Sequence, residues 1–123
     1  MNEFTMFSDE MKPAGDAVAI YARVALDEGN ELKEQADMLI KNAESVGDDV
    51  YSVYYECESG LKQNRTEFMR LMADIKDNKF KRLYIRDISR LTRNYLLISD
   101  ILKDIQNHNV EIVVCINGGK YEI

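Results

Sequence analysis

The sequence predicts an α/β fold with a mostly parallel sheet of four to five strands and helices on both faces. Short runs rich in Val, Ile and Tyr recur along the chain, as in buried strands. Segments with the helical spacing of apolar residues lie between these runs. Strict alternation of the two kinds of segment is typical of parallel sheets with helical crossovers. A length of 123 residues indicates one domain.

The first residues are expected to form a flexible tail, 1–16, followed by the folded domain, 17–123. The tail contains Pro13 and Gly15 and has little periodicity. It lacks the basic start and apolar centre of a signal peptide. No apolar run approaches the roughly 20 residues of a membrane span. A cytoplasmic location and no membrane partner are therefore expected.

The predicted elements follow in chain order. Strands are expected at 17–24, 50–57, 81–88 and 110–116. Helices are expected between them, at about 31–46, 65–77 and 93–108. Asn30 is a candidate cap for the first helix, and Gly47 is a candidate stop. In the third helix, Tyr95 and Leu97 are expected to be exposed apolar residues that could form an interface.

The cysteines and the single histidine are expected to be structural. Cys57 and Cys115 fall in predicted strands far apart in the sequence, and no second ligand stands at metal-binding spacing. Reduced thiols are therefore favoured. His108 lies near the end of a predicted helix, where a solvated or capping imidazole is expected.

Charge is segregated along the chain. The net charge of −6 argues against a general nucleic-acid binder, so any DNA contact has to come from a local basic patch. The segment 79–93 offers such a patch, with six basic residues against Asp87 alone.

Three arginines are predicted to meet at the carboxyl edge of the sheet, where parallel sheets bind their ligands. Arg23 lies near the end of the first strand. Arg90 and Arg93 follow the third strand at a spacing that would place both on one face of a starting helix. Guanidinium groups suit phosphate oxygens, so a converging cluster indicates a phosphate site.

Two other interpretations of this edge stay open. The arginines could be separate surface residues whose stems cover apolar side chains. Alternatively, Asp27, Glu28 and Asp87 could hold a magnesium ion, as in a phospho-acceptor domain. The sequence contains neither GxGxxG nor GxxxxGK[ST], so no nucleotide loop is predicted and no cofactor is expected.

Four motifs resemble, in order and at familiar intervals, the catalytic domain of serine recombinases, the resolvase and invertase family. They are YARVA at 21–25, ELKEQ at 31–35, ESG at 58–60 followed by Arg65, and SRLTRN at 89–94. The resemblance implies a resolvase-like fold and site-specific DNA recombination. In that reaction a serine hydroxyl attacks a DNA phosphodiester and forms a 5′-phosphoserine link, and a tetramer rejoins the strands in exchanged order.

The resemblance also implies roles for single residues. The active-site arginines, which position the scissile phosphate and stabilise its developing charge, correspond to Arg23, Arg90 and Arg93. The supporting residues are a further basic residue near the phosphate, a polar residue and an acid, which correspond to Arg65, Gln35 and Glu56.

Two positions depart from the family pattern. The nucleophilic serine corresponds to Ala25, whose methyl group cannot attack phosphorus, and the acid before the RLxRN arginine corresponds to Ser89. Ser89, Thr92 or Ser59 could offer another hydroxyl, but in-line attack requires placement to within about an ångström. An engineered change and a natural loss of cleavage both explain Ala25. The domain is therefore expected to be inactive in cleavage.

The resemblance further implies DNA as a partner. Members of the family continue into a long dimerisation helix and a DNA-binding domain, whereas this chain stops at Ile123. Weak, strongly salt-dependent DNA binding is therefore expected, and a homodimer or tetramer is expected in a full-length context. A second interpretation, from a different class, is a non-catalytic module of the same fold that serves protein association or regulation.

Overall fold

The computed structural model describes residues 16–26, 29–57, 65–116 and 119–122, and its elements alternate between strand and helix. They are β1 (Ala17–Val24), α1 (Glu31–Ser45), β2 (Asp49–Cys57), α2 (Thr66–Lys76), β3 (Arg82–Ile85), the short 3₁₀ turn η1 (Ile88–Arg90), α3 (Tyr95–Asn107), β4 (Glu111–Ile116) and β5 (Gly119–Glu122). Except for Asp16, the expected tail lies outside the described residues.

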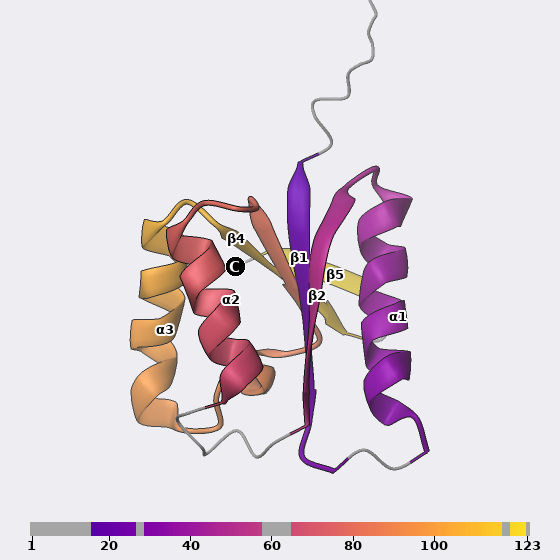
Figure 1. Ribbon diagram of the computed structural model, residues 1–123, viewed down its shortest axis with the longest axis horizontal. Coiled ribbons are helices and arrows are strands. Elements are labelled where there is room, and N and C mark those ends of the chain that lie inside the picture. The colour runs from indigo at the N-terminus through magenta and orange to yellow at the C-terminus, as the bar shows by residue number, and fades with distance from the viewer. Residues whose placement is uncertain (1–15, 27–28, 58–64, 117–118, 123) are drawn as a thin grey trace, which may run out of the picture.

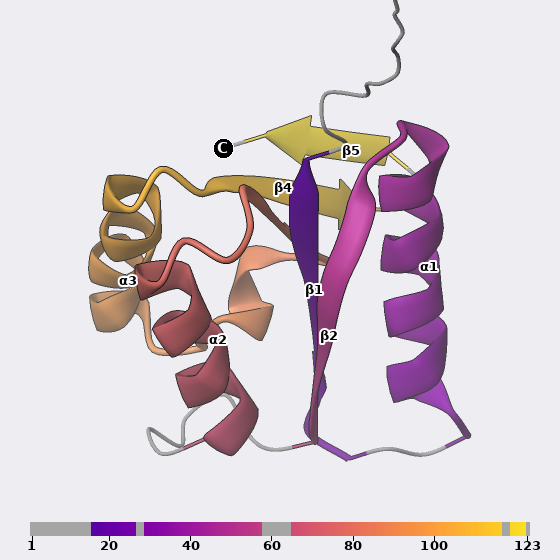
Figure 2. The same cartoon turned by 45° about the horizontal axis from the view of Figure 1, so that its top comes forward.

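The strands form one sheet in the order β2-β1-β3-β4-β5. The first four strands are parallel, and β5 runs antiparallel to β4. Helix α1 covers one face of the sheet, while α2 and α3 lie side by side on the other (Figures 1 and 2). The predicted α/β fold, with its mostly parallel sheet and helices on both faces, is confirmed.

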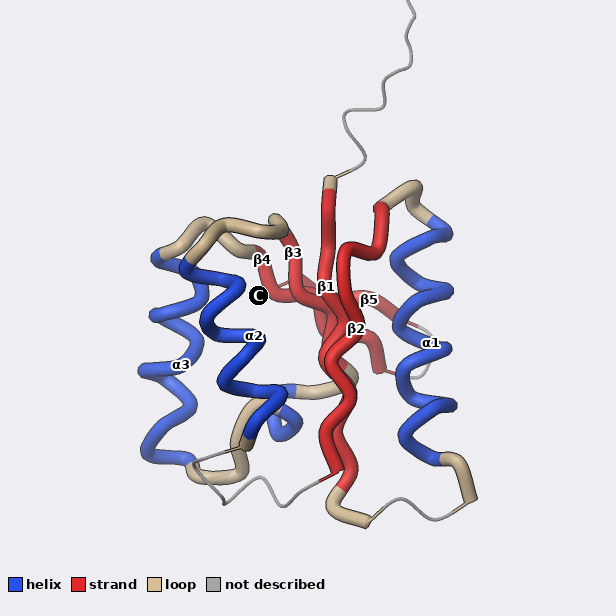
Figure 3. The backbone as a smooth tube through the Cα atoms, viewed as in Figure 1, coloured by secondary structure: helices blue, strands red, loops and turns tan. Residues whose placement is uncertain are grey.

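Strand β1 lies inside the sheet because its sequence is almost wholly apolar. Parallel strands that are covered on both faces have continuous apolar runs, and AVAIYARV is such a run except for Arg23. Residues 18–23 are at most 2% exposed. The carboxyl ends of β1 and β2 lie at the same edge of the sheet as the first turns of α1 and α2 (Figure 3). Because β1 to β4 are parallel, the carboxyl ends of these four strands share this edge.

The third strand and the third helix are shorter than predicted. The strand ends at Ile85, and the chain then forms η1 instead of continuing to residue 88. The helix begins at Tyr95 because the Asn94 side chain caps it, accepting a hydrogen bond from the backbone N–H of Leu96 at 3.0 Å. The prediction that Arg90 and Arg93 share one face of a starting helix is therefore wrong.

The expected ends of α1 and the expected exposure in α3 are partly met. Asn30 occupies the cap position with a φ of 66°, but its side chain makes no capping hydrogen bond. Gly47 follows the helix with a φ of 83°, which glycine adopts readily. Tyr95 and Leu96 are each 87% exposed, whereas Leu97 is half-buried, so the second exposed residue is the neighbour of the predicted one.

The structural roles expected for the cysteines and the histidine agree with the structure. Cys57 and Cys115 are free thiols, the first exposed and the second buried. His108 stands at the end of α3, where its Nδ1 lies 2.8 Å from the carbonyl oxygen of Asp104.

Candidate functional site

Arg23 is a buried arginine at the carboxyl end of the central strand. It is 2% exposed, and the amide of Gln35 in α1 fixes its backbone. Gln35 Oε1 accepts the Arg23 N–H at 3.1 Å, and Gln35 Nε2 donates to the Arg23 carbonyl at 3.2 Å. Gln35 is itself 5% exposed. The polar residue that the motif placed beside the site therefore sets the position of the strand end.

Two buried arginines donate to the carbonyls of the turn that carries Arg90. Arg23 donates from Nε to the carbonyl of Arg90 at 2.8 Å and from Nη2 to that of Ser89 at 2.6 Å. Arg65, just before α2, donates from Nη1 to the carbonyl of Arg90 at 3.4 Å and from Nη2 to that of Leu91. Carbonyls at the end of a helical turn lack partners within the turn, and the guanidinium groups provide them.

Arg90 donates a hydrogen bond to the backbone of Arg23 and also lines a pocket. Its Nη1 donates to the carbonyl of Arg23 at 2.9 Å, and its Nε lies 3.4 Å from Asp87 Oδ2 in an ion pair. The Arg90 side chain is 22% exposed, so it is the least buried of the three arginines in contact here.

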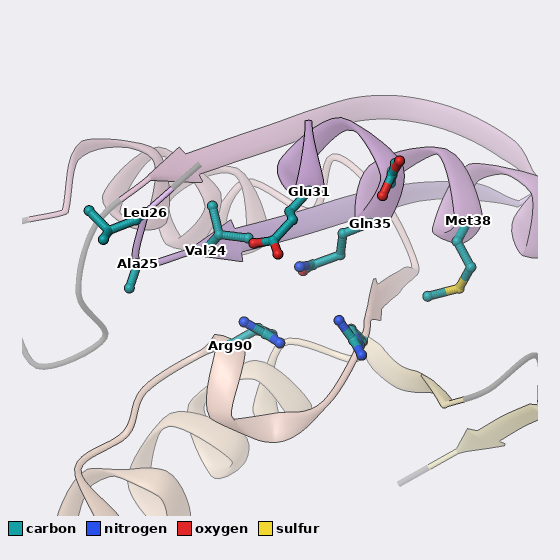
Figure 4. A pocket seen from close by; sticks show the side chains of 9 residues that line it. Val24, Ala25, Leu26, Glu31, Gln35, Met38 and Arg90 are labelled. Atoms are coloured by element: carbon teal, nitrogen blue, oxygen red, sulfur yellow. The ribbon is translucent and has the colours of Figure 1, made fainter. Parts of the chain in front are cut away.

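A pocket of about 660 Å³ opens between the end of β1, the start of α1 and the segment after β3. Figure 4 shows Arg90 on the wall opposite Gln35 and Glu31, with Ala25 at the end of the β1 wall. Its lining consists of Val24, Ala25, Leu26, Glu31, Glu34, Gln35, Met38, Arg86 and Arg90. The Ala25 methyl group and the Arg90 guanidinium therefore line the same space.

The electrostatics of the site reflect a cluster of positive charge. Burial lowers the pKa of Arg23 from its ordinary value, and the charges of Arg65, Arg90 and Arg93 lower it further. Arg93 is exposed and precedes α3, yet it is near enough to contribute. An anion in this region would offset the mutual repulsion of these groups.

Glu56 supports the site from β2 and lies away from the pocket. It is 4% exposed and accepts hydrogen bonds from the Tyr21 hydroxyl at 3.1 Å and from the backbone N–H groups of Glu67 and Phe68 at 3.2 and 2.8 Å. Burial, together with Glu56, raises the pKa of the Tyr21 hydroxyl despite the neighbouring Arg65. The Tyr21 side chain therefore donates a proton to this hydrogen bond and is not ionised.

Two of the three alternative hydroxyls make hydrogen bonds within the protein, and the third lies outside the described residues. Ser89 Oγ donates to Asp87 Oδ1, and Thr92 Oγ1 accepts the Asn94 N–H at 3.1 Å. Ser59 lies outside the described residues.

Sequence reasoning counted Arg86 only as part of the basic segment 79–93 and considered Asp87 only as a metal ligand, so it assigned neither to the phosphate site. Arg86 lines the pocket, and Asp87 pairs with Arg90 and accepts from Ser89. Their signal was their position directly after the third strand, where ligands are expected. The magnesium interpretation used Asp87 as a ligand, while its other proposed ligands, Asp27 and Glu28, lie outside the described residues.

Across the residues that the structure describes, no helix is long and apolar enough to cross a membrane.

Comparisons place the chain among known folds. The sequence model of the family described as Resolvase, N terminal domain, matches residues 18–122. The chain is similar to the N-terminal catalytic domain of TP901-1 integrase, with 31% identity and a TM-score of 0.74, over 80% of this chain and 76% of that one. It is also similar to the C-terminal catalytic domain of ISC1926 TnpA, an IS607-like serine recombinase, with 27% identity and a TM-score of 0.75, over 80% of this chain and 66% of that one.

A third similar structure is a serine recombinase from Sulfolobus solfataricus, with 27% identity and a TM-score of 0.61, over 79% of this chain and 66% of that one. The chain therefore spans just under two thirds of two of these three structures. No match was found among curated proteins.

Proposed function

The chain belongs to the resolvase family and carries its catalytic domain, and from this premise we propose that the domain binds the phosphate backbone of DNA at its arginine cluster without cutting it. The observation that carries the proposal is the pocket that Ala25 and Arg90 share. Its basic groups suit a phosphate, and its nucleophile position holds a methyl group.

The phosphate ligands in this proposal are the arginines that are at least partly exposed. Arg86 and Arg90 line the pocket, and Arg93 is exposed nearby. Permanently charged planar guanidinium groups can each donate two hydrogen bonds to phosphate oxygens. Arg23 is almost fully buried and donates to two carbonyls, so its part in binding is to orient Arg90.

Cleavage is proposed to be lost because attack on phosphorus requires a hydroxyl at the Ala25 position. In the family reaction, the serine oxygen forms a bond to phosphorus while the bond from phosphorus to the 3′ oxygen breaks. The hydroxyls of Ser89 and Thr92 make hydrogen bonds within the 87–94 segment. Neither lines the pocket beside Ala25.

Binding is proposed to be weak because the pocket also contains acidic residues. Glu31 and Glu34 belong to its lining, opposite the arginines, and the chain has a net charge of −6. Both features repel the DNA backbone, so affinity rests on a few local contacts that salt weakens.

The proposal is tested by the anisotropy of a labelled duplex titrated with the domain at increasing salt. Neutralising three phosphates predicts a slope of log affinity against log salt of about −3. Arg93→Ala is expected to reduce the steepness of the slope by about 1. Arg70→Ala, which removes an exposed charge on α2 that pairs with Glu67, is the matched control and should leave the slope unchanged. Tight, salt-insensitive binding would refute the proposal.

Loss of cleavage is tested by restoring the hydroxyl. Ala25→Ser, joined to a sequence-specific DNA-binding domain, is expected to form a covalent adduct with DNA that survives a denaturing gel. The same fusion with Ala25, and the double variant Ala25→Ser with Arg90→Ala, should give no adduct. An adduct formed by the unaltered sequence would show that another group acts as the nucleophile.

A second candidate function is protein association, which the exposed start of α3 favours. Tyr95 and Leu96 are each 87% exposed and follow Arg93 by two and three residues in the sequence. Large apolar side chains in adjacent exposed positions are typical of contact surfaces. In a full-length context, this surface would join subunits into a homodimer or tetramer. The double substitution Tyr95→Ser and Leu96→Ser would abolish such association while leaving DNA binding at the pocket intact.

A further inference from the structure

The family resemblance implies that Arg65 lies near the phosphate, but its side chain lies in the interior of the protein and does not face the pocket. It is 2% exposed and is absent from the lining of the pocket. The guanidinium carbon stacks over the ring of Phe68 at 4.4 Å, with Tyr21 at 6.0 Å. Both Nη atoms donate to carbonyls, one to Arg90 and one to Leu91. The Arg65 guanidinium is therefore held by stacking on one face and by hydrogen bonds from both Nη atoms.

Glu56 holds the start of α2, next to Arg65, in place. The first backbone N–H groups of a helix have no partner within it, and a carboxylate suits that positive end. At α2 this carboxylate comes from β2, because Glu56 accepts from the N–H groups of Glu67 and Phe68. The residue at the cap position, Arg65, makes no side-chain capping bond and is free to extend toward the turn.

These contacts form a continuous connection from the sheet to the Arg90 turn. Strand β2 holds the start of α2 through Glu56, and Arg65 at that start holds the carbonyls of Arg90 and Leu91. The central strand reaches the same turn through Arg23. Neighbouring strands thus attach to one turn, each through a buried arginine.

We propose that Arg65, anchored by Glu56, is a positioning residue that fixes segment 88–93 and so aims Arg90 into the pocket, and is not itself a ligand of the phosphate. The consequence for DNA rests on the proposed function above. A phosphate could reach the Arg65 fork only by displacing two carbonyls. The Arg90 carbonyl would keep its hydrogen bond from Arg23, but the Leu91 carbonyl would lose the charged donor that Arg65 provides in the interior. The fixed turn presents Arg90 before any ligand arrives, which lowers the ordering cost of binding.

The position of the turn is tested without DNA, by amide hydrogen exchange of the domain. Arg65→Lys keeps the charge but loses the planar fork. We expect the amides of Arg90 and Leu91, which donate to the carbonyls of Asp87 and Ile88, to exchange about tenfold faster, with α1 unchanged. Ile75→Val, a buried change in α2 away from the turn, controls for general destabilisation and should not produce this local effect. Unchanged exchange at Arg90 and Leu91 overturns the proposal.

A double-mutant cycle of Arg65 and Arg90, measured by DNA affinity, distinguishes a positioning role of Arg65 from a direct contact with phosphate. If Arg65 acts through Arg90, Arg65→Lys weakens binding about tenfold in the wild-type background and by less than about twofold when Arg90→Ala is present. A direct phosphate contact would be largely retained by Arg65→Lys, and its loss in Arg65→Ala would multiply with that of Arg90→Ala. Either of those results overturns the proposal.

The exchange experiment remains decisive if the domain does not bind DNA or if Arg65→Lys does not fold. If the wild-type domain binds no duplex, the proposed function fails, while the exchange experiment still decides whether Arg65 fixes the turn. If Arg65→Lys does not fold, Glu56→Gln replaces it, because an amide keeps the size of the side chain and removes the charge at the start of α2. It is expected to accelerate the same amides by a smaller factor, and unchanged exchange there again overturns the proposal.

Discussion

Arg23 and Arg90 bind each other reciprocally: Arg23 Nε donates to the Arg90 carbonyl at 2.8 Å, and Arg90 Nη1 donates to the Arg23 carbonyl at 2.9 Å. Each side chain thus binds the backbone of the other residue. Two like charges are held close because their donors are directed to carbonyl oxygens. The arrangement joins the end of β1 to the turn after β3.

This exchange predicts unequal effects for the two arginines on stability. Arg23→Lys should lower the free energy of unfolding by about 2 kcal/mol, because the carbonyls of Ser89 and Arg90 lose hydrogen bonds from a charged group that is itself buried. Arg90→Lys, at a partly exposed side chain, should cost about 1 kcal/mol. Urea unfolding followed by far-UV circular dichroism measures both. Arg70→Lys on the surface of α2 is the control, and a cost for Arg23→Lys no larger than for this control contradicts the prediction.

Gln35 gives a second prediction, which concerns geometry more than charge. Its amide both donates to and accepts from the backbone of Arg23, and a carboxylate at this position could only accept. Gln35→Glu and Gln35→Ala should each lower the free energy of unfolding by about 1 to 2 kcal/mol. Glu44→Ala, an exposed change on the same helix, should stay within about 0.5 kcal/mol of wild type. If Gln35→Glu is as stable as wild type, the donated hydrogen bond has no role.

A third prediction concerns alkaline pH. Burial is the main cause that raises the pKa values of Tyr21, Tyr54 and Tyr84, and the carboxylates of Glu56, Asp74 and Asp48 add to it. In the unfolded chain these hydroxyls ionise near pH 10, while in the folded protein they keep their protons. The contribution of these three tyrosines to the free energy of unfolding is therefore fully present below about pH 10. Above that pH the free energy of unfolding falls, by up to about 1.4 kcal/mol per pH unit for each tyrosine.

Urea unfolding between pH 8 and pH 11 measures this dependence. Tyr54→Phe should make the decline shallower, because one of the three groups no longer titrates. Tyr95→Phe is the matched control, because Tyr95 is 87% exposed, unlike the three buried tyrosines. A stability that stays constant to pH 11 would contradict the raised pKa values.

The fold was accessible from the sequence because its signals are local. The apolar run of β1 and the apolar faces of the helices predicted the layers, and the first strand matches its predicted bounds of 17–24. The third strand was predicted too long because Ile88 continues the apolar pattern, whereas the turn there depends on Arg23 and Arg65, which are distant in sequence. Asn94 was a readable signal for the true start of α3, since asparagine is a preferred cap.

The candidate site was predictable as a set of residues but not as a set of contacts. The motifs brought attention to Arg23 and Arg65, and their residue type alone suggested ligands for a phosphate. Whether an arginine faces solvent or a carbonyl depends on burial, which at Arg23 and Arg65 comes from elements far away in the chain. A motif therefore identifies which side chains gather, and the packing decides which of them can meet a ligand.

The fourth prediction uses Cys57 as a reporter of the pocket. Its Sγ lies 4.0 Å from the carbonyl oxygen of Ala25, and the residue is exposed, whereas Cys115 is fully buried. A thiol reagent should therefore modify Cys57 rapidly in the folded protein, and Cys115 only after urea is added. Mass spectrometry of the modified protein identifies the site, and Cys57→Ser provides the control that should remain unmodified.

If DNA binds at the pocket, an added duplex should slow the modification of Cys57, because a phosphate backbone beside Ala25 covers the thiol. The protection should weaken as salt rises, in parallel with binding. Arg70→Ala should keep the protection and Arg93→Ala should reduce it. Protection that is equal in both variants, or that persists at high salt, would place the duplex elsewhere on the domain and separate DNA binding from the arginines of the pocket.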